Sequence, residues 1–137
     1  MPLYVHHVAV DCRNAHGLSE WWKPVLGYTD VPGDPNEPGH TECVIVDPDD
    51  RHVGLIFIEV PEAKTVKNRL HLDLRPAGDA TRDDEVDRLL GLGATRVDDR
   101  RTPEGPGWVV MADPEGNEFC VLRSEAEVAA WQATRSV

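Results

Sequence analysis

The stretch HVAVD at residues 7–11 is matched 64 positions later by HLDLR at residues 71–75. Each stretch begins with histidine, has branched apolar residues at its second and fourth positions, and contains neither glycine nor proline. A period of two in apolar residues predicts a β-strand with one face against a core. The pair therefore predicts two related strands, one near the start of each half of the chain.

Two further features recur in the same order. Leu26-Gly27 is expected to close one helix, and Leu92-Gly93 closes another 66 positions later. The dipeptide Asp47-Pro48 recurs as Asp113-Pro114, again 66 positions later. Three features of different chemistry at nearly one period indicate two copies of a strand–helix–three-strand (βαβββ) unit.

The elements predicted from apolar spacing and turn residues follow this order. Pro61–Asn68 is interpreted as a linker between the two copies. The helices and strands are bounded by glycine, proline and capping residues. Helices are expected at 14–26, 81–92 and 124–134, and strands at 3–10, 28–31, 41–46, 53–60, 70–74, 94–97, 108–111 and 118–122.

These elements predict an α+β fold in which residues 1–137 form one domain. Repeat one covers residues 1–62, repeat two covers 67–123, and a C-terminal helix covers 124–134. A four-stranded sheet with a helix on one face leaves its other face open. Two such sheets are expected to form an open half-barrel around a cleft, lined by the side chains that alternate inward.

Composition limits the function. The 137 residues carry 25 acidic against 14 Lys and Arg side chains, a net charge of −11, so binding to nucleic acid or to a membrane surface is disfavoured. We expect no membrane span and no signal peptide, because no long apolar run and no basic N-terminal region occur. Three cysteines without C-x-x-C spacing favour a reducing, cytoplasmic environment.

The strand at 70–74 identifies the face that carries chemistry. Its leucines share one face and must pack on a helix, so His71, Asp73 and Arg75 are expected to look into the cleft. By the repeat, His7 is expected to look inward as well. The last predicted strand places Glu118 and Cys120 on one shared face.

Two histidines and a carboxylate on rigid strands can hold a divalent metal. We interpret His7, His71 and Glu118 as ligands for Zn, Fe, Mn or Ni, with open positions for substrate. Cys120 is the alternative to Glu118 as the third ligand. Asp73 or Glu118 is the candidate catalytic base and Arg75 the candidate anion clamp. The alternative is that both histidines line a pocket or form hydrogen bonds without metal.

Other candidates would contact a ligand. Cys120 is either a small buried apolar side chain or a ligand-contacting thiol. Trp108 either packs in the core or stacks on a ligand in the cleft. Phe57 is expected to line the cleft if the protein is a metal-free binder.

Five segments resemble the vicinal oxygen chelate superfamily, which includes glyoxalase I, bleomycin-resistance proteins and extradiol dioxygenases. The segments are HHVAVD at 6–11, WWKPVLGY at 21–28, LHLDL at 70–74, LGLGATRV at 90–97 and DPEGNEF at 113–119. Two longer segments, KNRLHLDL at 67–74 and GNEFCVL at 116–122, are more similar to the glyoxalase-like domain subgroup.

The resemblance implies the paired βαβββ fold, often as a homodimer, with metal ligands on the first, fourth, fifth and eighth strands. His7 and His71 match the first- and fifth-strand positions. The eighth-strand position, seven residues after Asp113, is Cys120 here, and only Glu59 lies near the fourth-strand position. The implied function is a metal-assisted lyase, isomerase or dioxygenase acting on a small oxygen-rich substrate. The alternative is a metal-free binding protein of the bleomycin-resistance type.

Overall fold

The computed structural model describes residues 1–135. The chain divides into two compact units, Met1–Lys64 and Thr65–Val137, at the stretch between the two predicted repeats. None of the helices among the described residues is long and apolar enough to cross a membrane.

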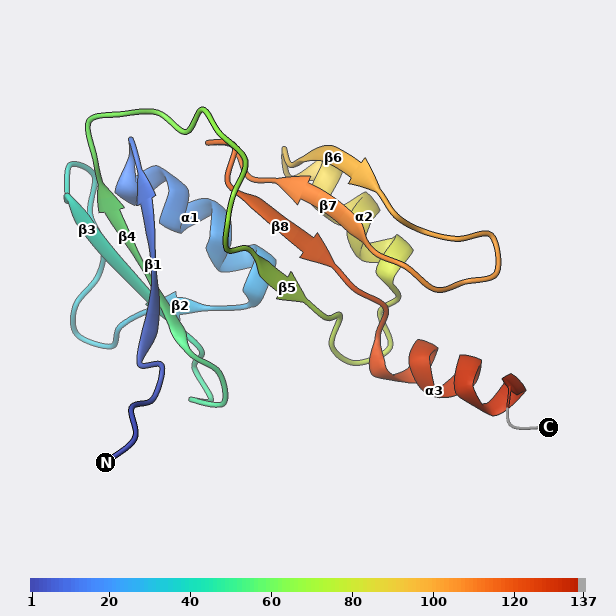
Figure 1. The fold of residues 1–137 in the computed structure, drawn as a ribbon. Helices are drawn as coiled ribbons and strands as arrows, with labels where there is room; N and C mark the ends of the chain where they lie inside the picture. Colours follow the sequence, from blue (N-terminus) through green and yellow to red (C-terminus); the bar gives the residue numbers. More distant parts are fainter. Residues whose placement is uncertain (136–137) are drawn as a thin grey trace. The chain divides into compact units, whose positions relative to one another are not determined.

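The first unit is a four-stranded sheet with one helix (Figure 1). The strand order is β1-β4-β3-β2, with β1 parallel to β4 and the other pairs antiparallel. Its elements are β1 (His7–Cys12), α1 (Ala15–Leu26), β2 (Thr29–Asp30), β3 (Glu42–Val46) and β4 (Gly54–Glu59).

The second unit repeats this topology. The strand order is β5-β8-β7-β6, again with the first strand parallel to the last and the other pairs antiparallel. Two sheets of the same topology confirm the predicted α+β fold built from two βαβββ units. The elements are β5 (Leu72–Leu74), α2 (Arg82–Gly91), β6 (Thr95–Asp99), β7 (Val109–Ala112), β8 (Glu118–Val121) and α3 (Glu125–Arg135).

The helices begin at the predicted capping residues. The Asn14 side chain accepts a hydrogen bond from the Gly17 amide at 2.9 Å, and Thr81 accepts one from Asp84 at 3.1 Å. Ser124 and Glu127 form a reciprocal capping box at α3. Helix α1 ends at Gly27, whose φ of 69° favours glycine.

The two Asp-Pro turns have the same internal geometry. The Asp47 carboxylate accepts the amides of Asp49 and Arg51 at 2.9 and 3.2 Å. The Asp113 carboxylate likewise accepts the amides of Glu115 and Asn117 at 2.9 and 3.0 Å. A side chain that satisfies two turn amides explains why aspartate stands at this position in both copies.

Each sheet buries one face and leaves the other more open. In the first unit, the paired residues Cys43 and Phe57 are buried, while Ile56 and Ile58, which flank Phe57 in β4, are only half-buried. In the second unit, Phe119 and Val121 of β8 and Val86 of α2 are buried on the helix-facing side. The helix-facing side therefore holds the core of each unit. On the other side of the second sheet, Cys120 and Glu118 of β8 are buried as well, whereas Asp73 of β5 is exposed.

The first strand starts later than predicted. We expected a strand over 3–10, but β1 begins at His7, which pairs with Gly54 at the start of β4. Residues before His7 have no partner strand in the described sheet, and Leu3 is exposed. Apolar composition alone predicted these residues as strand, whereas a strand also needs a neighbour.

The Asp47 turn yields a prediction about acid stability. Mainly the Asp49 amide, helped by that of Arg51, holds the pKa of Asp47 below its usual value of about 4. The ionised side chain therefore stabilises the fold above about pH 4, and this contribution is lost as pH falls through the lowered pKa. Asp47→Asn should be less stable than wild type at pH 7, with a difference that shrinks in acid. Urea unfolding between pH 7 and pH 3 measures this, with the exposed Asp49→Asn as control; a pH-independent difference would contradict it.

Candidate functional site

The open face of the second sheet carries its polar side chains. Asp73 of β5 lies opposite Cys120 of β8, and Leu72 lies opposite Phe119. Since paired residues share a face, Asp73 and Cys120 lie together on the open side, whereas Leu72 and Phe119 face the core. This confirms that the leucines and the polar residues of this strand lie on opposite faces.

His71, Asp73 and Cys120 form a compact donor cluster. The His71 Nδ1 atom lies 3.2 Å from Asp73 Oδ1 and 3.7 Å from Cys120 Sγ. One donor atom from each residue lies within 4.8 Å of the other two. The His71 and Asp73 side chains are 39% and 53% exposed, while Cys120 is buried, so a ligand can reach the cluster from solvent.

The environment of Cys120 disfavours its thiolate when no metal is bound. Burial, followed by the negative charge of Asp73, raises the pKa of the Cys120 thiol to about 11. At neutral pH the thiol is therefore protonated and is a poor nucleophile. A bound cation changes this balance, because coordination deprotonates a thiol.

Glu118 interacts with two residues of the segment that precedes β5. Its side chain forms an ion pair with Lys67 and accepts the Asn68 amide at 3.3 Å. The Glu118 backbone amide in turn donates to Asn68 Oδ1 at 3.3 Å. Sequence reasoning assigned Lys67 and Asn68 to a linker and missed this role, because no local pattern links them to a strand 50 residues later.

Arg75 and Trp108 remain accessible to a ligand. Arg75 is exposed and donates one hydrogen bond, from Nη1 to the Arg123 carbonyl at 2.9 Å. Trp108 precedes β7 and is 44% exposed. The guanidinium of Arg75 therefore has donors left for an anion, and the Trp108 ring has an open surface.

The first unit holds the two remaining candidates in different environments. His7 is exposed and lines a hollow of about 360 Å³ with His6, His52 and neighbouring residues of β3 and β4. Phe57 is fully buried on the helix-facing side, opposite Cys43. Phe57 therefore does not take the expected ligand-lining position, because its place in the strand period puts it in the core. The expected pairing of His7 with His71 stays a prediction.

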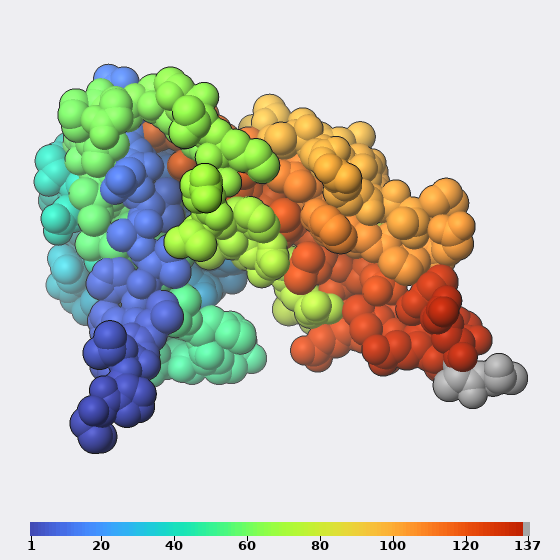
Figure 2. Space-filling model, in the orientation of Figure 1, coloured from blue at the N-terminus to red at the C-terminus, as the bar shows by residue number. Residues whose placement is uncertain are grey.

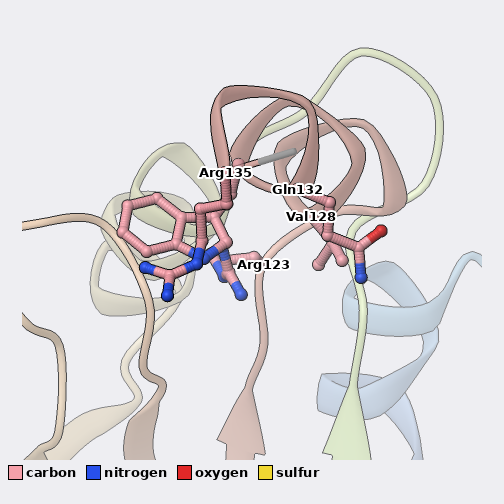
Figure 3. A pocket seen from close by; sticks show the side chains of 5 residues that line it. Arg123, Val128, Gln132 and Arg135 are labelled. Carbon is pink, nitrogen blue, oxygen red and sulfur yellow. The ribbon is translucent and has the colours of Figure 1, made fainter. Parts of the chain in front are cut away.

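A separate hollow lies along α3. Its volume is about 410 Å³, and its lining includes Arg123, Val128, Gln132 and Arg135 (Figure 3). The space-filling view shows α3, in red, at the surface beside the orange residues near 100 (Figure 2). None of the candidate metal or catalytic residues lines this hollow, so we do not assign the site to it.

The donor cluster fits a divalent metal. An imidazole nitrogen, a carboxylate oxygen and a sulfur are ligand types that zinc accepts, and three protein ligands leave a position for water or substrate. The residues that could hold the ion are therefore His71, Asp73 and Cys120. Glu118 is not part of this cluster, and its two carboxylate oxygens are bonded to Lys67 and to the Asn68 amide.

Comparisons with known proteins agree with this architecture. A family model described as a glyoxalase-like domain matches residues 7–122. No curated protein sequence matches the chain.

Several solved structures share the fold at low sequence identity. FosX from Mesorhizobium loti is 16% identical with a TM-score of 0.65, covering 95% of this chain and 99% of its own. Protein ATC0852 from Agrobacterium tumefaciens is 18% identical with a TM-score of 0.67, covering 88% and 97%. FosX from Listeria monocytogenes, complexed with Mn(II) and sulfate, is 11% identical with a TM-score of 0.66 and full coverage of both chains. Such identities show the fold alone.

The raised pKa of Cys120 yields a prediction about thiol reactivity. In metal-free protein, iodoacetamide should label Cys120 slowly at pH 7 and faster as pH rises toward about 11, because only the thiolate reacts. Peptide mapping by mass spectrometry measures the labelling, with urea-unfolded protein as the reference for an accessible thiol. Rapid labelling of native protein at pH 7 would contradict the described environment.

Proposed function

Because this chain belongs to the glyoxalase-like domain family of the vicinal oxygen chelate superfamily, we propose that it is a metal-assisted enzyme acting on a small, oxygen-rich substrate. The observation that carries the proposal is the convergence of His71, Asp73 and Cys120 on the open face of the second sheet. Three donors from two neighbouring strands, reachable from solvent, suit a catalytic metal better than a closed structural one.

The proposed ligands are His71 and Asp73, with a third donor from β8, either Glu118 or Cys120. His7 is kept as a further proposed ligand on the family resemblance alone. The candidate ions are Zn, Fe, Mn and Ni. When bound, such an ion polarises a substrate oxygen or activates a water molecule.

The chain's own residues supply binding and proton transfer. Glu118 is the proposed proton acceptor, because it lies two positions from Cys120 on the same face of β8 and pairs with a Lys67 side chain that is 71% exposed. Asp73, the other candidate base, lies 3.2 Å from His71 Nδ1 and is better placed as a donor to the metal. Arg75, two residues further along the same face, is proposed to bind an anionic group of the substrate.

The reaction class is proposed as lyase, isomerase or dioxygenase. One structure of the Listeria FosX is described with Mn(II) and 1S,2S-dihydroxypropylphosphonic acid, a small molecule with two hydroxyls and a phosphonate. A ligand of that kind supports the proposed substrate class. An exposed arginine beside a donor cluster suits the same chemistry.

A second candidate function is metal-free binding of a small molecule, as in bleomycin-resistance proteins. The observation that favours it is that Lys67 already neutralises Glu118, and that His71 and Asp73 already contact each other. The net charge of −11 suits a cationic ligand. Thermal stabilisation by bulky cations, with none by divalent metals, would support this function over the enzyme.

We also propose a homodimer in the cytoplasm. The family resemblance supports the dimer, and three free cysteines support a reducing compartment. Size-exclusion chromatography with light scattering tests the dimer, and a monomeric mass would overturn it.

The proposed function predicts the metal content of a variant. His71→Ala should lose bound divalent metal relative to wild type, because it removes the donor shared by both short contacts in the cluster. Elemental analysis after purification without chelator measures the metal-to-protein ratio. Unchanged metal content would contradict the proposed site.

The matched control is His40→Ala. His40 lies in the loop before β3, is exposed, and accepts only a local hydrogen bond from the Glu37 amide. This variant should keep the wild-type metal content, so that a loss in His71→Ala reports the site and not the general loss of a histidine.

A further inference from the structure

Two side chains on the open face of β8 compete to complete the donor set. Glu118 and Cys120 are two positions apart, which corresponds to roughly 7 Å along a strand. A single ion held by His71 and Asp73 therefore lies much nearer to one of the two β8 side chains, Glu118 or Cys120, than to the other. The strand register and the existing hydrogen bonds decide which one.

The register favours Cys120. Cys120 lies directly opposite Asp73, and its Sγ lies 3.7 Å from His71 Nδ1. Two ligands at ordinary zinc–sulfur and zinc–nitrogen bond lengths in a tetrahedral arrangement lie roughly 3.5 Å apart. For nitrogen and oxygen ligands the separation is roughly 3.4 Å, and His71 Nδ1 lies 3.2 Å from Asp73 Oδ1. Both distances from His71 Nδ1 are thus close to those expected for ligands of one ion, and all three donors lie within 4.8 Å of one another.

The hydrogen bonds of Glu118 disfavour it. Its carboxylate is bound by the Lys67 ammonium and the Asn68 amide, and its own amide is bound by Asn68. Moving Glu118 to a metal would break both side-chain bonds. It would also leave the Lys67 ammonium near a second positive charge, which is repulsive.

We propose that Cys120, and not Glu118, completes the metal site with His71 and Asp73, so that this chain selects zinc over manganese. Thiolate sulfur is a soft ligand that favours Zn²⁺ and Co²⁺, whereas Mn²⁺ favours an all-oxygen or oxygen–nitrogen set. Glu118 then does not bind the metal; it stays paired with Lys67 and Asn68 and keeps its proposed role as proton acceptor. The inference rests on the proposed metal-assisted function and names the ion and the donor that function would use.

The test uses Co²⁺ as a spectroscopic substitute for Zn²⁺. Wild-type protein with Co²⁺ should show a near-ultraviolet sulfur-to-cobalt charge-transfer band, which Cys120→Ser should lose and Glu118→Gln should keep. Zn²⁺ affinity, measured by competition with a chromophoric chelator, should fall more than about 100-fold in Cys120→Ser. Removing a residue that only hydrogen-bonds a metal ligand already lowers metal affinity by up to about 100-fold, and removing the ligand itself should cost more. Mn²⁺ should bind wild type more weakly than Zn²⁺.

Cys12→Ser is the matched control, because Cys12 is also a buried free cysteine but lies in the first unit. It should keep the cobalt band, and circular dichroism should show that all variants are folded. Loss of the band in Glu118→Gln but not in Cys120→Ser would overturn the inference, as would tighter binding of Mn²⁺ than of Zn²⁺.

The outcomes separate this inference from the proposed function. Metal binding without a thiolate band would overturn the role of Cys120 but leave a metal-assisted enzyme. No binding of Co²⁺, Zn²⁺ or Mn²⁺ would overturn both and leave the metal-free binder.

Discussion

The parallel pairing of β5 with β8 is the constraint on which the proposed site depends. This pairing places Asp73 opposite Cys120, 47 positions later in the sequence, and the alternation of side chains places His71 on the same face. A shift of one residue in this register would turn Cys120 toward the core and bring Phe119 to the open face. The buried Phe119 and Val121 side chains and the half-buried leucines of β5 oppose such a shift, because it would expose them to water. The hydrophobic core thus sets the geometry of the donor cluster.

The two units use one scaffold for different purposes. Both have the same strand order, and both close their Asp-Pro turn with an aspartate that accepts two backbone amides. These shared features determine the path of the backbone, and both copies need them to form the same strand order. The open faces differ: β4 of the first unit presents Ile56 and Ile58, whereas β8 at the equivalent place presents Glu118 and Cys120. Duplication conserves what holds the fold and leaves the open face free to change, which is why fold alone does not determine function.

The Lys67–Glu118 ion pair lies next to the proposed metal site. A carboxylate that is neutralised by an ammonium and bound by an amide is a weaker metal ligand than an unpaired one, and the neighbouring thiol becomes the more available donor. The same pair also lowers the free-energy cost of burying the Glu118 carboxylate, which is 9% exposed, since a buried charge without a partner is costly. One contact from outside the strands therefore affects the buried charge of the sheet and, in the proposed metal site, the choice of donor from β8.

The sequence by itself determined the repeat, the α+β class, the helix caps and the face on which His71, Asp73 and Cys120 lie, because these follow from local periodicity and from turn chemistry. It placed Phe57 in the ligand-lining set, where the pairing with Cys43 puts the ring in the core instead. It named Glu118 as the metal ligand from β8 and left Cys120 as the alternative. Only the tertiary structure brought Lys67 and Asn68 to Glu118 and set the distances from His71 to its two neighbours. Those contacts join residues far apart along the chain, and the packing of the whole sheet, not any local pattern, decides them.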